Sequence, residues 1–318
     1  MSGYTGRLPQ MDRRIFLTDG GIETTLIFQQ GLDLPFFAAF HLLRDAQGVD
    51  ALRRYYSGHA AIAVRNGVGF VLESATWRAS SDWGSRLGYT PEALDTANRR
   101  AIEILHDLRR ELETGQSPMV ISGCVGPRGD GYRPETSMSA DEAQAYHARQ
   151  VRVFADAGAD LATAITMTSS AEAIGIARAA VAAGLPSVIS FTVETDGRLP
   201  TGETLAEAIA AVDAATEGAP AYYMINCAHP THFAHALAPG TDWVARIRGL
   251  RANASTCSHA QLDEATTLDD GDPIELGQQY RELRARFPQI TVLGGCCGTD
   301  TRHIEQMARQ CLADAAVY

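Results

Sequence analysis

The chain has 318 residues, of which 45% are hydrophobic and 20% are charged, so it holds enough apolar side chains to bury a large core. Its formal net charge of −11 argues against nucleic-acid partners, because phosphate backbones attract basic surfaces. No apolar run reaches the roughly 18 residues of a membrane span, and the polar residues 1–14 lack the apolar centre of a signal peptide. We therefore expect a cytoplasmic protein with neither nucleic-acid nor membrane partners, of undetermined oligomeric state.

Short apolar runs rich in β-branched residues recur along the chain. Most of them start about 25 to 55 residues apart, which leaves room for a helix after each run. Parallel strands that are buried on both faces show such continuous hydrophobic runs. The eight predicted strands are Ile15–Thr18, Val68–Glu73, Met119–Cys124, Asp160–Thr166, Ser187–Thr192, Tyr222–Cys227, Ile247–Asn253 and Ile290–Gly294.

The segments between these runs have helical composition. Asp141–Asp156, Ala171–Ala183 and Glu203–Ala215 are rich in Ala, Glu, Gln and Arg, which favour helices. Pro91 opens another predicted helix, with Thr90 as its N-cap. Eight such βα units without a break in composition predict an α/β fold, a (β/α)8 TIM barrel that forms a single domain over residues 1–318. The alternative, an open Rossmann-like sheet, favours a G-x-G-x-x-G motif after a strand, and we find none in that context.

Two long connections depart from this regular alternation. The first, Gly20–Val68, contains a predicted helix over Gly21–Gln30, a turn at Pro35–Phe37 and a helix near Val49–Asn66. We interpret its first part as an insertion over the barrel mouth. The second contains the acidic segment Asp263–Asp272, which is typical of a solvated surface loop.

Cysteines mark the ends of two predicted strands. In an α/β barrel the functional residues collect where the strands end, on the carboxyl side. The sixth strand ends in Asn226-Cys227, and the eighth is followed by Cys296-Cys297, which has glycines on both sides. Only one strand separates these two in a closed barrel, so the three cysteines can converge although they lie far apart in the sequence.

Three converging thiolates suit Zn²⁺, which takes sulfur ligands in tetrahedral geometry. Three protein ligands leave a fourth position open, as in catalytic zinc sites. Free cysteines are often buried small hydrophobes instead, and we prefer that interpretation for Cys124, Cys257 and Cys311. A zinc site rich in thiolates binds a substrate thiol as thiolate and keeps its sulfur electron-rich, which favours alkyl transfer to sulfur over hydrolysis.

Four motifs follow predicted strands. They are Asp19-Gly20-Gly21, Gly123-Cys124-Val125-Gly126-Pro127, Asn226-Cys227 and Gly294-Gly295-Cys296-Cys297-Gly298-Thr299. Together they resemble the homocysteine S-methyltransferase family, over about residues 16–308. The resemblance implies a barrel, a zinc ion held by Cys227, Cys296 and Cys297, and homocysteine or a related thiol as methyl acceptor, with methionine as the product. It also implies a small onium donor, for which S-methylmethionine, S-adenosylmethionine and betaine-like compounds are the candidates.

The resemblance also suggests substrate contacts. Asp19 resembles the family's aspartate that contacts the homocysteine ammonium, a charge-assisted pairing. The alternative for Asp19 is the N-cap of the helix that follows it. The backbone amides of Gly20 and Gly21 can approach a substrate closely because glycine has no side chain. Asn226, beside the first cysteine, is a further predicted contact.

One position departs from the family pattern. Family members have Glu-Thr at the end of the fourth strand, whereas this chain has Ile165-Thr166. Either Glu73 or Glu194, at the ends of the second and fifth strands, replaces the missing carboxylate, or the acceptor has no free amino group. Trp77 is a candidate cation–π platform for an onium methyl group, or alternatively a packed rim aromatic.

Other interpretations stay open at this point. Histidines at positions 229, 232 and 235 have helical spacing and are alternative metal ligands, although His229-Pro230 is typical of a turn. A zinc hydrolase or lyase on the same barrel would need a general base, for which Glu194 or Glu73 are candidates. A non-catalytic zinc-binding module is the third interpretation.

Overall fold

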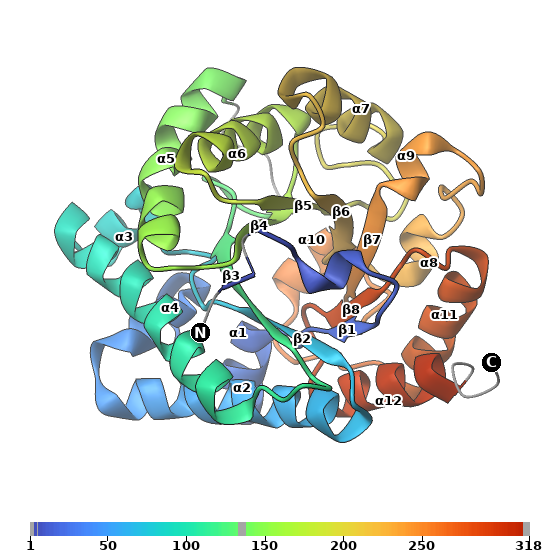
Figure 1. Ribbon diagram of the computed structural model, residues 1–318, viewed down its shortest axis with the longest axis horizontal. Coiled ribbons are helices and arrows are strands. Elements are labelled where there is room, and N and C mark those ends of the chain that lie inside the picture. Colours follow the sequence, from blue (N-terminus) through green and yellow to red (C-terminus); the bar gives the residue numbers. More distant parts are fainter. Residues whose placement is uncertain (1–2, 5, 133–137, 314–318) are drawn as a thin grey trace.

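The computed structural model describes residues 3–4, 6–132 and 138–313. Within them, eight parallel strands pair in sequence order, and β1 pairs with β8 to close a barrel. Figure 1 shows the strands at the centre and the helices in a ring around them. The predicted (β/α)8 fold is therefore confirmed.

The strand positions agree with the sequence prediction to within about two residues at each end. The agreement follows from the burial of the strands, because nearly every strand residue is shielded from solvent and is accordingly apolar or small. The strands are β1 Phe16–Leu17, β2 Gly69–Glu73, β3 Met119–Val125, β4 Leu161–Met167, β5 Ser187–Phe191, β6 Tyr222–Asn226, β7 Ile247–Ala252 and β8 Val292–Gly295.

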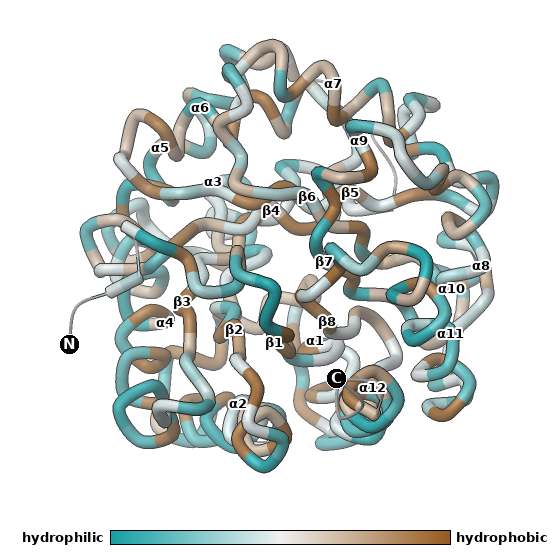
Figure 2. The backbone as a smooth tube through the Cα atoms, turned by 45° about the vertical axis from the view of Figure 1, so that its right-hand side comes forward, coloured by the Kyte–Doolittle hydropathy of each residue, from teal (hydrophilic) through white to brown (hydrophobic). Residues whose placement is uncertain are grey.

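The helices pack one apolar face on the barrel. In α4, the side chains of Ile102, Leu105 and Leu108 are fully buried, whereas residues of the opposite face are exposed. Figure 2 shows hydrophobic and hydrophilic residues mixed along the surrounding helices in this way. The helices are α1 Ile22–Thr24, α2 Ala46–Asn66, α3 Ser81–Arg86, α4 Pro91–Leu112, α5 Ala140–Asp156, α6 Ser170–Ala183, α7 Leu205–Thr216, α8 Pro230–Phe233, α9 Asp242–Ala245, α10 His259–Glu264, α11 Pro273–Arg286 and α12 Thr301–Leu312.

Local capping signals set several of these boundaries. The hydroxyl of Thr90 accepts a hydrogen bond from the backbone N–H of Ala93 at 3.2 Å, which confirms the predicted start of α4. Helix α2 begins a turn earlier than predicted, because Asp45 accepts from the N–H of Gly48 at 2.8 Å. No helix in the described part of the chain is long and apolar enough to cross a membrane.

The connection between β1 and α2 is less regular than predicted. The helix expected over Gly21–Gln30 starts as α1 and continues through Thr25–Gln29 as a single turn of π-helix. Pro35–Phe37 forms a 3₁₀ turn, as its proline suggested. The side chain of Phe37 lines the cavity at the barrel mouth, in agreement with the interpretation of this segment as an insertion there.

Candidate active site

A cavity of about 220 Å³ opens at the carboxyl ends of the strands. Residues at or after the ends of β1, β2, β3, β4, β6, β7 and β8 line it, together with part of the connection after β1. This is the face of the barrel on which the sequence placed the functional residues.

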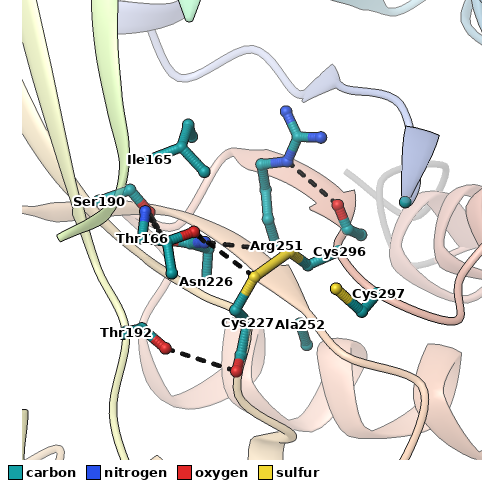
Figure 3. The surroundings of a disulfide bond; sticks show 12 residues. Ile165, Thr166, Ser190, Thr192, Asn226, Cys227, Arg251, Ala252, Cys296 and Cys297 are labelled. Carbon is teal, nitrogen blue, oxygen red and sulfur yellow. Dashed lines mark hydrogen bonds between the residues drawn. A yellow bond between two sulfur atoms is a disulfide. The ribbon is translucent and has the colours of Figure 1, made fainter. Parts of the chain in front are cut away.

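Cys227, Cys296 and Cys297, here called the cysteine triad, meet in this cavity. Their sulfurs all lie within 4.8 Å of one another, and no other group of three or more His, Cys, Asp or Glu side chains in the described residues converges in this way. Cys227 and Cys296 are joined by a disulfide, and Cys297 is free (Figure 3). From the sequence, all three were expected to be thiolates. The difference arises because sulfurs brought this close can also bond to each other, so reduction must precede any use of the triad as a ligand set.

Backbone conformation turns the triad toward a common point. Cys227 follows β6 with a φ of 52°, and Thr166 in β4 has a φ of 65°, in the left-handed region that non-glycine residues rarely adopt. The register between β4 and β5 shifts at this point. As a result the Thr166 hydroxyl lies 3.6 Å from the Cys227 sulfur. Strain of this kind persists where the surrounding structure over-determines it, as at functional sites.

Each sulfur of the triad has one polar neighbour. Besides the contact of Thr166 with Cys227, the Asn226 amide donates to the Cys296 sulfur at 3.9 Å. The Tyr132 hydroxyl donates to the Cys297 sulfur at 3.5 Å. These three donors orient the sulfurs, and in the reduced triad they would partly balance negative charge on thiolates.

Asn226 supports the triad from outside the cavity. Its side chain is fully buried and does not belong to the cavity lining. Its Oδ1 accepts from the Thr166 backbone N–H at 3.0 Å and from the Ser190 hydroxyl at 2.6 Å, and its Nδ2 donates to the Thr166 hydroxyl at 2.8 Å (Figure 3). The structure therefore places this predicted substrate contact as a support of the sulfurs.

Glycines allow the loops after β1 and β8 to pack together. A Cβ on Gly21 would lie 2.5 Å from the Cys296 carbonyl oxygen, and one on Gly20 would lie 2.6 Å from the Thr299 carbonyl oxygen. The Gly21 N–H donates to that Thr299 oxygen at 2.9 Å. Both glycines line the cavity, as expected, but the Gly21 amide is already engaged within the protein.

Asp19 lies in the cavity wall with only 2% of its surface exposed. One carboxylate oxygen accepts from Arg251 Nη2 at 2.7 Å, and the other accepts from the Tyr55 hydroxyl at 3.0 Å. The alternative role of Asp19 as a helix cap is wrong, because the N-cap of α1 is Gly21 and no side chain caps this helix.

The two glutamates considered as replacements for the missing carboxylate occupy different places. Glu73 lines the cavity at the end of β2, and burial raises its pKa to about 7. Glu194 does not line the cavity. Its Oε1 lies 2.9 Å from His259 Nδ1, and His259 Nε2 lies 2.8 Å from the Cys227 carbonyl oxygen. Glu194 thus supports the backbone of the triad, with the Tyr132 ring stacked on the imidazole at 3.9 Å.

The apolar and aromatic part of the lining contains Ile165 and Trp77. The Trp77 indole N–H donates to the Ile165 carbonyl oxygen at 3.2 Å. The Arg78 guanidinium lies 4.1 Å from the Trp77 ring centroid and 3.8 Å from that of Trp83, so the Trp77 ring already contacts one cation.

The histidines proposed as alternative ligands lie outside the triad. His229 is the N-cap of α8, and burial lowers its pKa to about 4. His232 contacts the Thr256 carbonyl oxygen at 3.0 Å. Asp263, the first residue of the acidic segment expected to be a surface loop, lies instead within α10 and lines the cavity.

Several polar residues of the cavity and its wall were not predicted from the sequence, among them Tyr132, Arg251, Glu23 and Tyr55. Arg251 and Glu23 line the cavity, and Tyr55 holds Asp19. Burial raises the pKa of Glu23 to about 7. Arg251 had a usable signal, because it is one of two arginines inside the otherwise apolar run of β7. Tyr55 and Glu23 had none, because they lie in helical segments of mixed composition.

A family model described as homocysteine S-methyltransferase matches residues 16–311. The chain belongs to this family. The match includes every member of the cysteine triad and all of the barrel strands, and it confirms the resemblance seen in the four motifs. The enzyme is therefore a thiol S-methyltransferase, and the cavity is its candidate active site.

Among its relatives in this family, homocysteine S-methyltransferase 4 from Zea mays is 24% identical over 265 residues, covering 75% of this chain and 74% of that protein. The fold matches the homocysteine methyltransferase MmuM from Escherichia coli. Its metallated form aligns with a TM-score of 0.74 at 20% identity, covering 96% of this chain and 99% of that one. Its oxidized form aligns with a TM-score of 0.72 at 19% identity, over 97% and 100% of the two chains.

Proposed function

We propose that the reduced cysteine triad holds a zinc ion and that the enzyme methylates the thiol of homocysteine or a related compound. The observation that carries this proposal is the convergence of three sulfurs within 4.8 Å at the wall of a cavity. A set of three sulfur donors fits zinc and leaves one position for a substrate. The metallated form in which the similar Escherichia coli enzyme was solved supports a metal here.

When bound, zinc lowers the pKa of a thiol so that the thiolate exists at neutral pH. The residues of this chain then position the reactants. The hydrogen bonds from Thr166, Asn226 and Tyr132 hold the three sulfurs. In the reaction a sulfur–carbon bond to the acceptor forms while the carbon–onium bond of the donor breaks. The electron pair of the broken bond stays with the donor, and the thiol proton passes to solvent.

A small onium compound is the proposed donor, and the charge of the cavity supports it. Acidic side chains outnumber basic ones among the described residues of the lining, which favours a cationic ligand. The acids are Asp19, Glu23, Glu73, Asp130 and Asp263, and the bases are Arg78 and Arg251. S-methylmethionine, S-adenosylmethionine and betaine-like ammonium compounds all meet this requirement.

X-ray absorption at the zinc edge tests the proposal. We expect the reduced, zinc-loaded protein to show three sulfur neighbours and a fourth when homocysteine is added, because the acceptor sulfur takes the open position. Adding methionine, which lacks a thiol, is the control and should leave three. A sulfur count that stays at three with a thiol that is methylated would contradict the proposal.

Removing a hydrogen bond to the triad should weaken the metal site. We expect Tyr132→Phe to lower zinc affinity or activity by about 10-fold or more, since groups that support metal ligands typically contribute 10- to 100-fold. Competition with a chromophoric chelator measures the affinity. Tyr146→Phe is the matched control, because that hydroxyl bonds Ser80 and not a sulfur. Equal zinc affinities of the two variants would show that the Tyr132 hydroxyl has no such role.

A further inference from the structure

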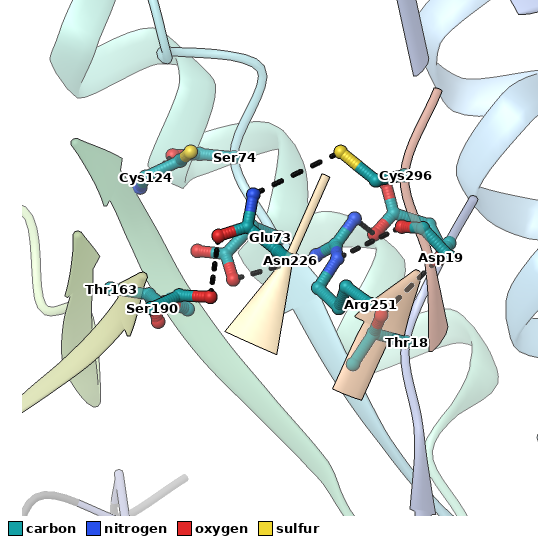
Figure 4. A network of polar contacts seen from close by, with 12 residues as sticks. Thr18, Asp19, Glu73, Ser74, Cys124, Thr163, Ser190, Asn226, Arg251 and Cys296 are labelled. Atoms are coloured by element: carbon teal, nitrogen blue, oxygen red, sulfur yellow. Dashed lines mark hydrogen bonds and ion pairs between the residues drawn. The ribbon is translucent and has the colours of Figure 1, made fainter. Parts of the chain in front are cut away.

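Arg251 has one nitrogen that no hydrogen bond uses. The side chain lines the cavity and is only 7% exposed. Nε donates to the Gly295 carbonyl oxygen at 3.1 Å, and Nη2 donates to Asp19 at 2.7 Å (Figure 4). Nη1 is buried and makes no hydrogen bond within the described part of the chain. It forms a longer ion pair with Oε2 of Glu73, at 3.7 Å.

Glu73 has an acceptor atom that complements the unused donor of Arg251. Its side chain is 5% exposed, and its Oε1 is buried without a hydrogen-bond donor among the described residues. A buried polar atom without a partner is costly, and more so when the group is charged. Two such atoms of opposite type, beside each other in one cavity, therefore indicate a ligand that brings both an acceptor and a donor.

The pair lies beside the cysteine triad. In the barrel register, Arg251 is opposite Asn226 on one side and Gly294 on the other. The next residue, Ala252, accepts a hydrogen bond from the Cys296 backbone N–H at 2.8 Å. A small thiol in this cavity can therefore reach the sulfurs with one end and the Arg251–Glu73 pair with the other.

Asp19 is less available to bind an ammonium group than Glu73. Both of its carboxylate oxygens are occupied, one by Arg251 and the other by Tyr55. An ammonium group bound at Asp19 would compete with the buried ion pair between Asp19 and Arg251. Ile165, at the position of the family's glutamate, adds only apolar surface to the lining. Among these three residues, Glu73 has the free carboxylate oxygen.

We propose that Arg251 and Glu73 bind the zwitterionic end of an α-amino acid acceptor. Arg251 Nη1 holds the α-carboxylate, and Glu73 Oε1 accepts from the α-ammonium. This inference rests on the proposed function, and it narrows the acceptor from thiols in general to thiols that carry both charged groups, such as homocysteine.

The test measures methyl transfer to three acceptors by the wild type and two variants, as reduced, zinc-loaded enzymes. The acceptors are homocysteine, 3-aminopropane-1-thiol, which lacks the carboxylate, and 4-mercaptobutyrate, which lacks the ammonium. For the wild type we expect kcat/KM to favour homocysteine over each analogue by about 10- to 150-fold, the value of one charged hydrogen bond. Calorimetric Kd values should follow the same order.

Each variant should remove one preference and keep the other. In Arg251→Met, homocysteine should lose its advantage over 3-aminopropane-1-thiol. In Glu73→Gln it should lose its advantage over 4-mercaptobutyrate. Because Arg251→Met removes the ion-pair partner of Asp19, Arg251→Lys is made beside it. Zinc content and circular dichroism verify that both variants bind zinc and fold. Adding Ile165→Glu to Glu73→Gln should restore the lost preference, because it returns a carboxylate to the cavity.

Two results would overturn the inference. One is a wild type that uses the three acceptors equally well. The other is a pair of variants that lower kcat/KM for all three acceptors by the same factor, which would assign Arg251 and Glu73 a purely structural role. A failure of the proposed function looks different, because no thiol would then be methylated. In that case the calorimetric preferences alone decide whether the pair recognises the zwitterion.

Discussion

Changing all three triad cysteines to serine should reduce the zinc content from about one ion per chain to none and abolish methyl transfer. The physical reason is that serine hydroxyls are poor zinc ligands at neutral pH, since they stay protonated. The measurement is elemental analysis of protein purified under reducing conditions, followed by an assay for methionine. The reducing step is needed because Cys227 and Cys296 otherwise form a disulfide.

Cys257→Ser is the matched control, since this cysteine is free and partly exposed and does not belong to the triad. It should keep both the zinc and the activity. Full zinc content in the triple variant would contradict the metal assignment. Loss of zinc with undiminished methyl transfer would instead remove the metal from the reaction.

Glu73→Gln should make the stability of the protein less sensitive to pH. Burial raises the pKa of Glu73 from 4.5 to about 7, so between these values the folded state binds more protons than the unfolded state. The stability of the wild type therefore falls as pH rises through this window. Glutamine imitates the protonated form, so it avoids this loss. We expect the unfolding free energy of the variant, relative to the wild type, to increase by about 2 to 3 kcal/mol between pH 5 and pH 8.

Urea denaturation at several pH values measures this difference. Glu103→Gln, at an exposed position of α4, is the control and should follow the wild type at every pH. A Glu73→Gln curve that runs parallel to the wild type would show that solvent reaches this carboxylate. It would also weaken the case for an unpartnered oxygen in the acceptor site.

The strands and the starts of α4, α5, α6 and α7 were predicted to within about two residues, because their causes are local. An apolar run such as Met119–Val125 is buried wherever a parallel sheet forms around it. The caps at Thr90 and Asp45 act within three residues, although only the first was predicted. The π-helical turn at Thr25–Gln29 was missed, since helical periodicity does not distinguish it from an α-helix.

The roles of individual polar residues were less predictable. Glu73 and Glu194 look alike in the sequence, as each stands at or just beyond the end of a strand. Closure of the barrel turns the first toward the cavity, whereas His259 holds the second behind the triad. Asn226 was expected at the substrate and instead supports the sulfurs, because its side chain points toward Thr166 and Ser190.

The sequence by itself determined the barrel, the family and the three cysteines, since each depends on residue types in short runs at characteristic positions. Only the tertiary structure decided which charges face one another. The contact between Arg251 and Asp19 spans 232 residues of chain and depends on the closure of β1 against β8 and on the register of β7. No local preference encodes that closure, because it results from all eight strands packing around one core. The acceptor site is therefore visible only in the folded protein.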